Sequence, residues 1–257
     1  MTRRGEWARQ ANRFTDRIMA DGSTAWPVEP GRYRLVVSLA CPWAHRSIIV
    51  RRLLGLEEAI GLAVVDTVTG LVVTNDFPQI SLDLSTQWRA HARPDAPDLY
   101  PAELRDEIDD VSTGVYADVN NGVYKAGIAT SQDVYEAAFE ALFARLDRLS
   151  ERLATRRYLV GRAISEADVR LFVTLVRFDA VYHGHFKCNR HKLTEMPVLW
   201  AYARDLYQTP GFGETVDFDH IKRHYYVTHP QINPSGVVPV GPDPAGWTTP
   251  HGREGLR

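Results

Sequence analysis

The sequence predicts a small α/β unit over residues 33–90, followed by an all-helical domain over residues 102–232. Two observations predict this order. The first unit contains short apolar, β-branched runs on either side of a helical pattern. In the second unit, apolar residues recur every three or four positions. An N-terminal arm (1–32) and a C-terminal tail rich in proline and glycine (233–257) complete the predicted organisation.

Composition narrows the class of protein. The chain of 257 residues is 44% hydrophobic and 24% charged, as an ordinary globular protein is. Its net charge of −2 gives no electrostatic reason to expect nucleic acid or an anionic membrane as a partner. The sequence shows neither an apolar run that could span a bilayer nor a signal-peptide core. Its two cysteines lie far apart and do not form a disulfide framework, so we expect a cytoplasmic location.

The first predicted strand leads directly to a cysteine. Tyr33–Leu39 is apolar and β-branched, and a helical pattern follows from about Trp43 to Leu56. Cys41 therefore stands at a strand-to-helix junction, with Pro42 in the first helical turn, where its missing N–H costs nothing. A helix N-terminus stabilises a thiolate. Cys41 is thus a candidate reactive thiol, the alternative being a small buried residue.

The rest of the α/β unit predicts a hairpin and a linker. Two short β runs, Leu62–Val65 and Leu71–Thr74, flank a turn at Thr69-Gly70. Residues 91–101, rich in proline and aspartate, read as a linker to the helical domain.

Several helices are expected beyond the linker. One of them begins at Ser165, which forms a capping box with Asp168. The predicted helices cover Leu104–Val119, Ser131–Leu153, Ser165 to Phe178, and the segment from Pro197 to just before Pro210.

A set of strings, in a fixed order along nearly the whole chain from residue 33, resembles one family. They are CPWAHR (41–46), VVTND (72–76), DVNNGVYKAG (118–127), YLVGRAISEADVRLFVTLVRFDAVYHGHFKCN (158–189), DFDHIKRHYY (217–226), INPSGVVPVGP (232–242) and PHGRE (250–254). Together they resemble the glutathione transferase superfamily, and more narrowly the glutathionyl-hydroquinone reductases of the Xi class.

The resemblance implies a fold and a reaction. The fold is a thioredoxin-like N-terminal domain, a helical glutathione-transferase C-terminal domain and a homodimer. The reaction is the thiol-dependent reduction of S-glutathionyl-hydroquinones, with glutathione as co-substrate and no metal. Cys41 attacks the sulfur of the conjugate, releases the hydroquinone and holds glutathione as a mixed disulfide, which a second glutathione resolves. A cysteine at this position disfavours the conjugating glutathione transferases, which use a tyrosine or serine hydroxyl.

The resemblance also implies binding residues. Asp76 would meet the ammonium of the γ-glutamyl group, and Phe77 stands where many members have serine. Three tyrosines, Tyr124, Tyr182 and Tyr225, would stack on the quinol ring and form hydrogen bonds with its hydroxyls. The alternative is that each is a half-buried tyrosine at a helix contact. The implied residues are Trp43, Asn75, Asp76 and Phe77 for glutathione, and Tyr124, Tyr182 and Tyr225 for the hydroquinone.

The chain departs from the family in the middle of the thioredoxin-like unit. No proline occurs between Pro42 and Pro78, so the Val-Pro pair whose main chain clamps glutathione is missing, together with a strand and a helix. The N-terminal arm, with Trp7, Phe14 and Trp26 as candidate anchors, or a dimer partner would cover the apolar surface this leaves. Two alternatives follow: a reductase that uses another low-molecular-weight thiol, or a catalytically impaired member that serves as a binding or dimerisation module.

Histidines near the second cysteine suggest zinc, but their spacing does not support it. His183 and His185 would point apart on a helix, and neither Cys188 nor His191 completes a regular ligand pattern. We expect Cys188 to be a buried structural thiol. The pair His220 and His224 shares a helix face, but no acidic residue completes a metalloprotease motif there.

Overall fold

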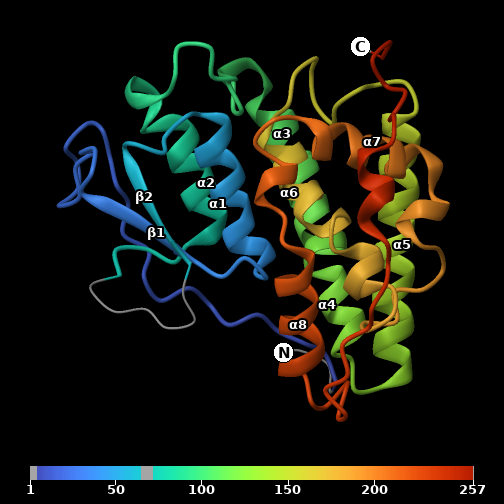
Figure 1. The fold of residues 1–257 in the computed structure, drawn as a ribbon. Helices are drawn as coiled ribbons and strands as arrows, with labels where there is room; N and C mark the ends of the chain where they lie inside the picture. Colours follow the sequence, from blue (N-terminus) through green and yellow to red (C-terminus); the bar gives the residue numbers. More distant parts are fainter. Residues whose placement is uncertain (1–4, 65–71, 257) are drawn as a thin grey trace.

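The computed structural model describes residues 5–64 and 72–256, which form a small α/β unit beside a helical bundle (Figure 1). The α/β unit contains β1 (Tyr33–Val37), α1 (Pro42–Leu53), β2 (Ile60–Val64) and α2 (Phe77–Thr86). The bundle contains α3 (Arg105–Gly114), α4 (Gly122–Gly127), α5 (Gln132–Leu153), α6 (Glu166–Leu175), α7 (Pro197–Gln208) and α8 (Phe218–Thr228). None of the helices in these residues is both long and apolar enough to cross a membrane.

The first half of the α/β unit is a parallel βαβ arrangement. Strands β1 and β2 pair in parallel, with Tyr33 opposite Ile60 and Val37 opposite Val64, and α1 makes the crossover between them. The predicted first strand is confirmed and ends at Val37, and the predicted helix is confirmed from Pro42 to Leu53. Gly55 follows the helix with φ 68°, a left-handed conformation that glycine adopts without penalty, and so turns the chain toward β2.

The predicted hairpin is only partly within the described residues. Its first run is confirmed from Leu62 to Val64, within β2, which begins at Ile60. Val65, the turn at Thr69-Gly70 and Leu71 lie outside the described residues. The remainder of the second run, 72–74, is not a strand, so that prediction is wrong there. Thr74 instead forms an isolated antiparallel bridge with Thr15 of the N-terminal arm, because the arm supplies the partner that a hairpin would have supplied.

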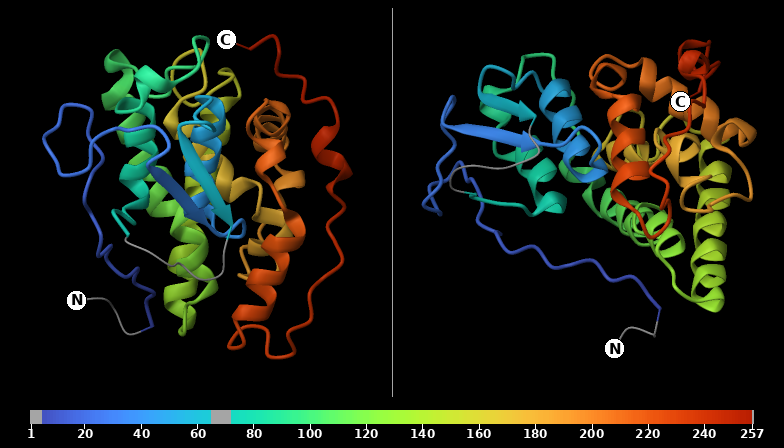
Figure 2. Two further views of the ribbon diagram at one scale, coloured as in Figure 1. Left: turned by 60° about the vertical axis from the view of Figure 1, so that its left-hand side comes forward. Right: turned by 60° about the horizontal axis from the view of Figure 1, so that its bottom comes forward.

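The N-terminal arm runs as an extended segment from the bundle to the sheet (Figure 2). It begins beside the N-terminus of α5, where the Thr130 amide donates to the Gly5 carbonyl over 3.3 Å. Farther along, Arg17 holds Asp83 of α2 with Nε and Nη2, at 3.2 and 2.5 Å. The arm is therefore tied to both parts of the fold.

The three expected anchors of the arm behave differently. Trp7 stacks on Tyr124, and the Trp26 indole donates to Asp16 within the arm itself, over 3.0 Å. Phe14 does not anchor the arm with its ring, which is 46% exposed; its backbone makes the contact instead.

The apolar side chains of the short sheet remain partly open. Val36, Leu62 and Val64 are 39%, 38% and 45% exposed. The arm therefore does not cover them. It packs instead along α2 and the cysteine end of α1.

The bundle is built around α6, every residue of which is buried. The predicted capping box is confirmed, with the Ser165 amide donating to Asp168 Oδ2 over 2.8 Å. The helix ends at Leu175, before the predicted Phe178, because the chain rewinds into a π-helical turn, η4 (Phe178–Tyr182). The predicted helix to Val119 likewise becomes α3 followed by a π-helical stretch, η3 (Val115–Asn120). The helices predicted over 131–153 and from Pro197 are confirmed as α5 and α7.

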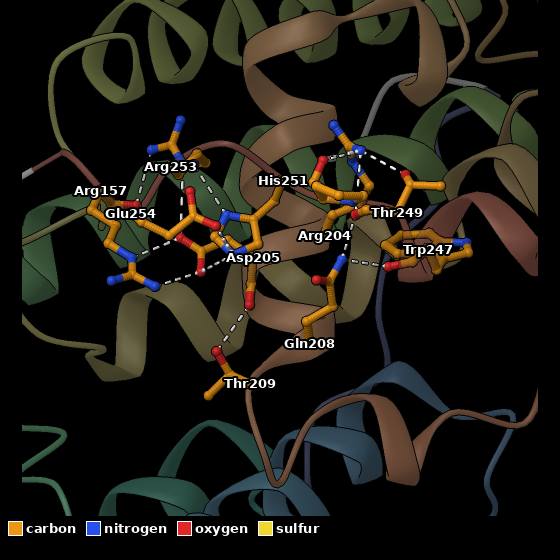
Figure 3. Close-up of polar contacts among 11 residues, drawn as sticks. Arg157, Arg204, Asp205, Gln208, Thr209, Trp247, Thr249, His251, Arg253 and Glu254 are labelled. Atoms are coloured by element: carbon orange, nitrogen blue, oxygen red, sulfur yellow. Dashed lines mark hydrogen bonds and ion pairs between the residues drawn. The ribbon is translucent and has the colours of Figure 1, made fainter.

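The C-terminal tail is fastened to α7 (Figure 3). Asp205 is buried on α7 and receives two hydrogen bonds from Arg157, at 2.9 and 2.8 Å. Two tail side chains approach the same carboxylate: His251 at 3.5 Å and Arg253 at 3.9 Å. Gln208 also donates to the Trp247 carbonyl over 2.9 Å. These contacts hold the tail on the surface of the bundle.

Candidate functional site

Cys41 occupies the N-cap position of α1. Its backbone is extended, with φ −74° and ψ 116°, and its carbonyl accepts the first helical hydrogen bond from the His45 amide, over 3.0 Å. The cysteine is free and only partly buried, whereas Trp43, two residues further on, is buried. The strand–Cys–Pro–helix junction therefore presents a thiol at the positive end of a helix dipole.

The backbone that leads into Cys41 is held by Arg177, which follows α6. Its Nε donates to the Ala40 carbonyl and its Nη2 to the Leu39 carbonyl, both over 3.1 Å. Its Nη1 lies 3.0 Å from Nδ1 of the buried His45. Burial and this guanidinium hold the pKa of His45 well below its usual range. The sequence did not predict a role for Arg177, because no local pattern reveals that a residue in the bundle contacts the strand–helix junction.

Three tyrosines from three elements meet beside this junction. Tyr124 of α4 lies 2.5 Å from Tyr225 of α8, oxygen to oxygen, and Tyr182 of η4 lies 3.0 Å from Tyr225. Burial raises the pKa of all three phenols, so their hydroxyls are protonated near neutral pH. Protonated phenols can both donate and accept hydrogen bonds, so the three hydroxyls form one connected polar group.

Trp43 connects the tyrosines to the thiol end of α1. Its ring packs against Phe77, at 4.6 Å between centroids, and lies 6.4 Å from the ring of Tyr124. Trp43 follows Cys41 by two residues in the first turn of α1, so the same helix end carries the thiol and the ring that faces Tyr124. The structure thus brings Cys41, Trp43, Phe77 and the three tyrosines to one place.

Asn75 and Asp76, the expected γ-glutamyl contacts, lie next to Phe77 but bond to the arm. The Asn75 amide donates to the Phe14 carbonyl over 2.8 Å, and the Phe14 amide donates to Asn75 Oδ1 over 3.2 Å. Asn12 Nδ2 donates to Asp76 Oδ1 over 3.1 Å. Asn75 and Asp76, which the sequence predicted to bind glutathione, therefore form hydrogen bonds with the arm instead.

Two arm residues enter the aromatic cluster itself. Trp7 stacks on Tyr124 with 5.4 Å between centroids and an interplanar angle of 21°. The guanidinium of Arg9 lies 4.1 Å from the centroid of Trp43, and its Nε donates to Asn121 Oδ1 over 3.1 Å. Sequence reasoning named Trp7 only as an anchor and did not identify Arg9. The spacing of Trp7 and Arg9, two residues apart in the arm, is the sequence feature that could have indicated that both side chains contact the same site.

The histidine-rich segment makes contacts of another kind. His185 Nε2 lies 3.2 Å from His229 Nδ1, and burial is the largest cause that lowers the pKa of His185, to about 4. Cys188 is fully buried, as expected, and burial raises its pKa. Across residues 5–64 and 72–256, no three histidine, cysteine or acidic side chains are grouped so that they could hold a metal ion.

Comparison with known proteins gives the class of the fold. A family model described as the C-terminal domain of glutathione S-transferase matches residues 132–205. A glutathione transferase structure from Gordonia bronchialis is 54% identical and superposes with a TM-score of 0.90, over 94% of this chain and 91% of that one. A Xi glutathione-S-transferase from Phanerochaete chrysosporium is 37% identical, with a TM-score of 0.89 over 94% of each chain. The fold is that of a glutathione transferase.

A curated relative narrows the class further. The glutathionyl-hydroquinone reductase YqjG of Escherichia coli is 38% identical over 97% of this chain and 93% of its own length. Its glutathione-bound structure superposes with a TM-score of 0.86, over 93% of this chain and 96% of that one. The chain belongs to the glutathionyl-hydroquinone reductases, the Xi class of glutathione transferases. The alignment with YqjG spans 308 positions, more than the 257 residues of this chain, in keeping with a shortened thioredoxin-like domain.

Proposed function

We propose that this protein reduces S-glutathionyl-hydroquinones to hydroquinones through a mixed disulfide at Cys41. The observation that carries the proposal is the position of a partly exposed thiol at the N-terminus of α1, beside a row of three protonated tyrosine hydroxyls. Membership of the family supports the same reaction, and the glutathione-bound YqjG structure supports glutathione as the thiol.

The first step transfers the glutathionyl group to the enzyme. The ring carbon that bears the sulfur takes up a proton while the adjacent ring hydroxyl loses one, which gives the keto tautomer of the conjugate. The Cys41 thiolate then attacks the sulfur, so an S–S bond forms while the carbon–sulfur bond breaks. The electron pair of the broken bond passes to the adjacent ring oxygen, which gains a proton as the hydroquinone leaves. The conjugate is thereby reduced and the two sulfurs are oxidised to a disulfide.

The second step restores the thiol. A glutathione thiolate attacks the glutathionyl sulfur of the mixed disulfide, glutathione disulfide leaves, and Cys41 returns as thiolate. Overall, one glutathione and one conjugate give one glutathione disulfide and one hydroquinone.

The tyrosines act on the hydroquinone half of the substrate. Because their pKa values are raised, they donate hydrogen bonds rather than accept them as phenolates. As protonated phenols they can donate to the ring oxygen on which negative charge develops as the carbon–sulfur bond breaks.

Turnover of the glutathione conjugate of menadiol with excess glutathione tests the proposal. We expect release of menadiol by the wild-type protein, loss of at least 1000-fold in Cys41→Ser, as expected on removing a nucleophile, and retention in Cys188→Ala. The second variant is matched because Cys188 is the other cysteine of the chain and is buried. Activity that survives in Cys41→Ser would overturn the mechanism.

A second function is favoured by one specific observation. The arm bonds to Asn75 and Asp76, and the described sheet has two strands, which leaves Val36, Leu62 and Val64 partly exposed. A folded protein without turnover, with either glutathione or another low-molecular-weight thiol, would support a catalytically retired binding or dimerisation module.

Assembly and location belong to the same proposal. We infer a homodimer in the cytoplasm, with glutathione and the hydroquinone conjugate as small-molecule partners and no metal. The exposed apolar residues of the sheet support association of two copies. Light scattering on the purified protein distinguishes a dimer from a monomer.

A further inference from the structure

Arg9 brings a positive charge from the arm to a cluster of aromatic rings, where Arg46 of α1 also lies on Trp43, at 4.7 Å from its centroid. Its guanidinium lies 4.1 Å from the centroid of Trp43, 4.7 Å from that of Trp7 and 5.5 Å from that of Tyr124. Asn121 at the start of α4 holds the guanidinium there by accepting a hydrogen bond from Nε at Oδ1. Burial lowers the pKa of Arg9, while Tyr124 and Cys41 are among the groups that raise it. The guanidinium is therefore a partly desolvated cation within electrostatic range of the thiol.

One nitrogen of this guanidinium has no acceptor. Arg9 Nη2 is buried and makes no hydrogen bond within the part of the chain that the structure describes. A buried donor on a charged group that stays unpaired is costly, and cation–π contacts satisfy the charge but not the N–H. The unpaired donor therefore marks the place of an acceptor, and in this surrounding an anionic oxygen suits it best.

We propose that Arg9 is a substrate-binding residue, and that its Nη2 donates to the hydroquinone oxygen that becomes negatively charged as the carbon–sulfur bond breaks. This inference rests on the proposed function. As Cys41 takes the glutathionyl sulfur from the keto tautomer, the electron pair of the carbon–sulfur bond moves to that oxygen, which is protonated as the hydroquinone leaves. A guanidinium at this point stabilises the charge when it forms.

Arg9 lies where the two halves of the site meet. The polar residues expected at the γ-glutamyl group, Asn75 and Asp76, bond to Asn12 and Phe14 of the arm. The guanidinium of Arg9 faces Tyr124, implied for the quinol, as well as Trp43 and Phe77, so the experiments below compare the two halves of the substrate. The arm thereby supplies part of the hydroquinone site in a chain whose thioredoxin-like domain is shortened.

The first experiment needs no turnover. The rate at which Cys41 is alkylated by the anion iodoacetate is compared with the rate for the neutral iodoacetamide. We expect Arg9→Gln to lower this ratio about threefold, as for the loss of one nearby charge in partly exposed surroundings, and Arg9→Lys to preserve it. Arg13→Gln, on an exposed arginine of the same arm, is the matched control. An unchanged ratio in Arg9→Gln would overturn the proposal even if the protein proves inactive.

The second experiment separates the two halves of the substrate. We expect Arg9→Gln to lower kcat/KM for the menadiol conjugate by about 10- to 100-fold, as for the loss of a charged hydrogen bond. The release of glutathione from glutathionylated Cys41 should stay within about twofold of wild type, because that step involves no ring oxygen. An equal loss in both steps would assign Arg9 to glutathione and contradict the inference. No turnover in the wild type would instead reject the proposed function.

Discussion

Arg177 Nη1 donates to His45 Nδ1 over 3.0 Å, in the buried seam between α1 and the bundle. This direction leaves the proton of neutral His45 on Nε2, which lies 2.7 Å from Thr215 Oγ1. The Thr215 hydroxyl in turn donates to the Phe212 carbonyl, so both imidazole nitrogens and the hydroxyl beside them have partners. Because Arg177 also holds the Leu39 carbonyl, the seam fixes the chain immediately before Cys41.

Replacement of Arg177 by lysine should therefore impair catalysis through the position of Cys41. A lysine ammonium cannot reach two carbonyls and the imidazole from one point, so the junction loses part of its support. We expect kcat to fall by about 10- to 100-fold, as for a small displacement of a reacting group, with KM much less affected. The control is Arg148→Lys, on an exposed arginine of α5. A wild-type kcat in a folded Arg177→Lys protein would contradict the positioning role.

The central tyrosine of the row should matter for both activity and stability. Tyr225 bonds to both Tyr124 and Tyr182, so Tyr225→Phe leaves two largely buried hydroxyls without that partner. We expect the free energy of unfolding to fall by about 1–3 kcal/mol and kcat/KM for the conjugate to fall by about 10-fold or more. Denaturant unfolding and steady-state kinetics measure the two effects. Tyr226→Phe, at the neighbouring position of α8, should change kcat/KM less than twofold.

Much of this fold could be predicted from local patterns. The strand before Cys41, the helix after it and the capping box at Ser165 each depend on residues within a few positions of one another. The π-helical turn that ends α6 early was not foreseen, because it reflects packing of the following turn rather than local propensity.

The site divides in the same way. Cys41 could be identified from its own junction, and the tyrosines only through the family strings that contain them, because Tyr124 and Tyr225 meet across more than a hundred residues. Arg9 and Arg177 were missed for the same physical reason: each acts on elements far away in the sequence. The path of the arm over Asn75 and Asp76 depends on which surfaces the shortened domain leaves open, and no local pattern encodes that.

Stability should fall below pH 6.5 because two buried histidines are neutral in the folded protein. The pKa of His185 is lowered to about 4 and that of His45 lies well below 6.5, with burial the largest cause for both. The unfolded chain therefore takes up protons first, and the stabilisation present above pH 6.5 is lost as the pH falls toward 4, by at most about 1.4 kcal/mol per pH unit for each group.

Two variants test how much His185 contributes to the loss of stability at low pH. Urea unfolding is measured between pH 7.5 and pH 4.5 for His185→Gln and for His191→Gln, which changes an exposed histidine. We expect the pH dependence to be shallower in His185→Gln alone. Equal slopes in the two variants would show that His185 is not the group responsible.

The buried carboxylate of Asp205 should be a main support of the C-terminal tail. Asp205→Asn removes the charge that Arg157, His251 and Arg253 share, while the side chain keeps its size. Breaking a buried ion pair costs about 3–5 kcal/mol, so we expect Tm to fall by roughly 6–20 °C for a chain of this length. The matched control is Asp219→Asn. This change breaks an ion pair with Arg223, in which the two side chains are 72% and 69% exposed, and should lower Tm by less than about 3 °C.

Limited proteolysis locates the effect, because loosening of the tail exposes cleavage sites after residue 233 before the bundle unfolds. A Tm for Asp205→Asn equal to that of Asp219→Asn would show that the packing of Trp247 against Trp200 and Tyr207, rather than the carboxylate, holds the tail in place.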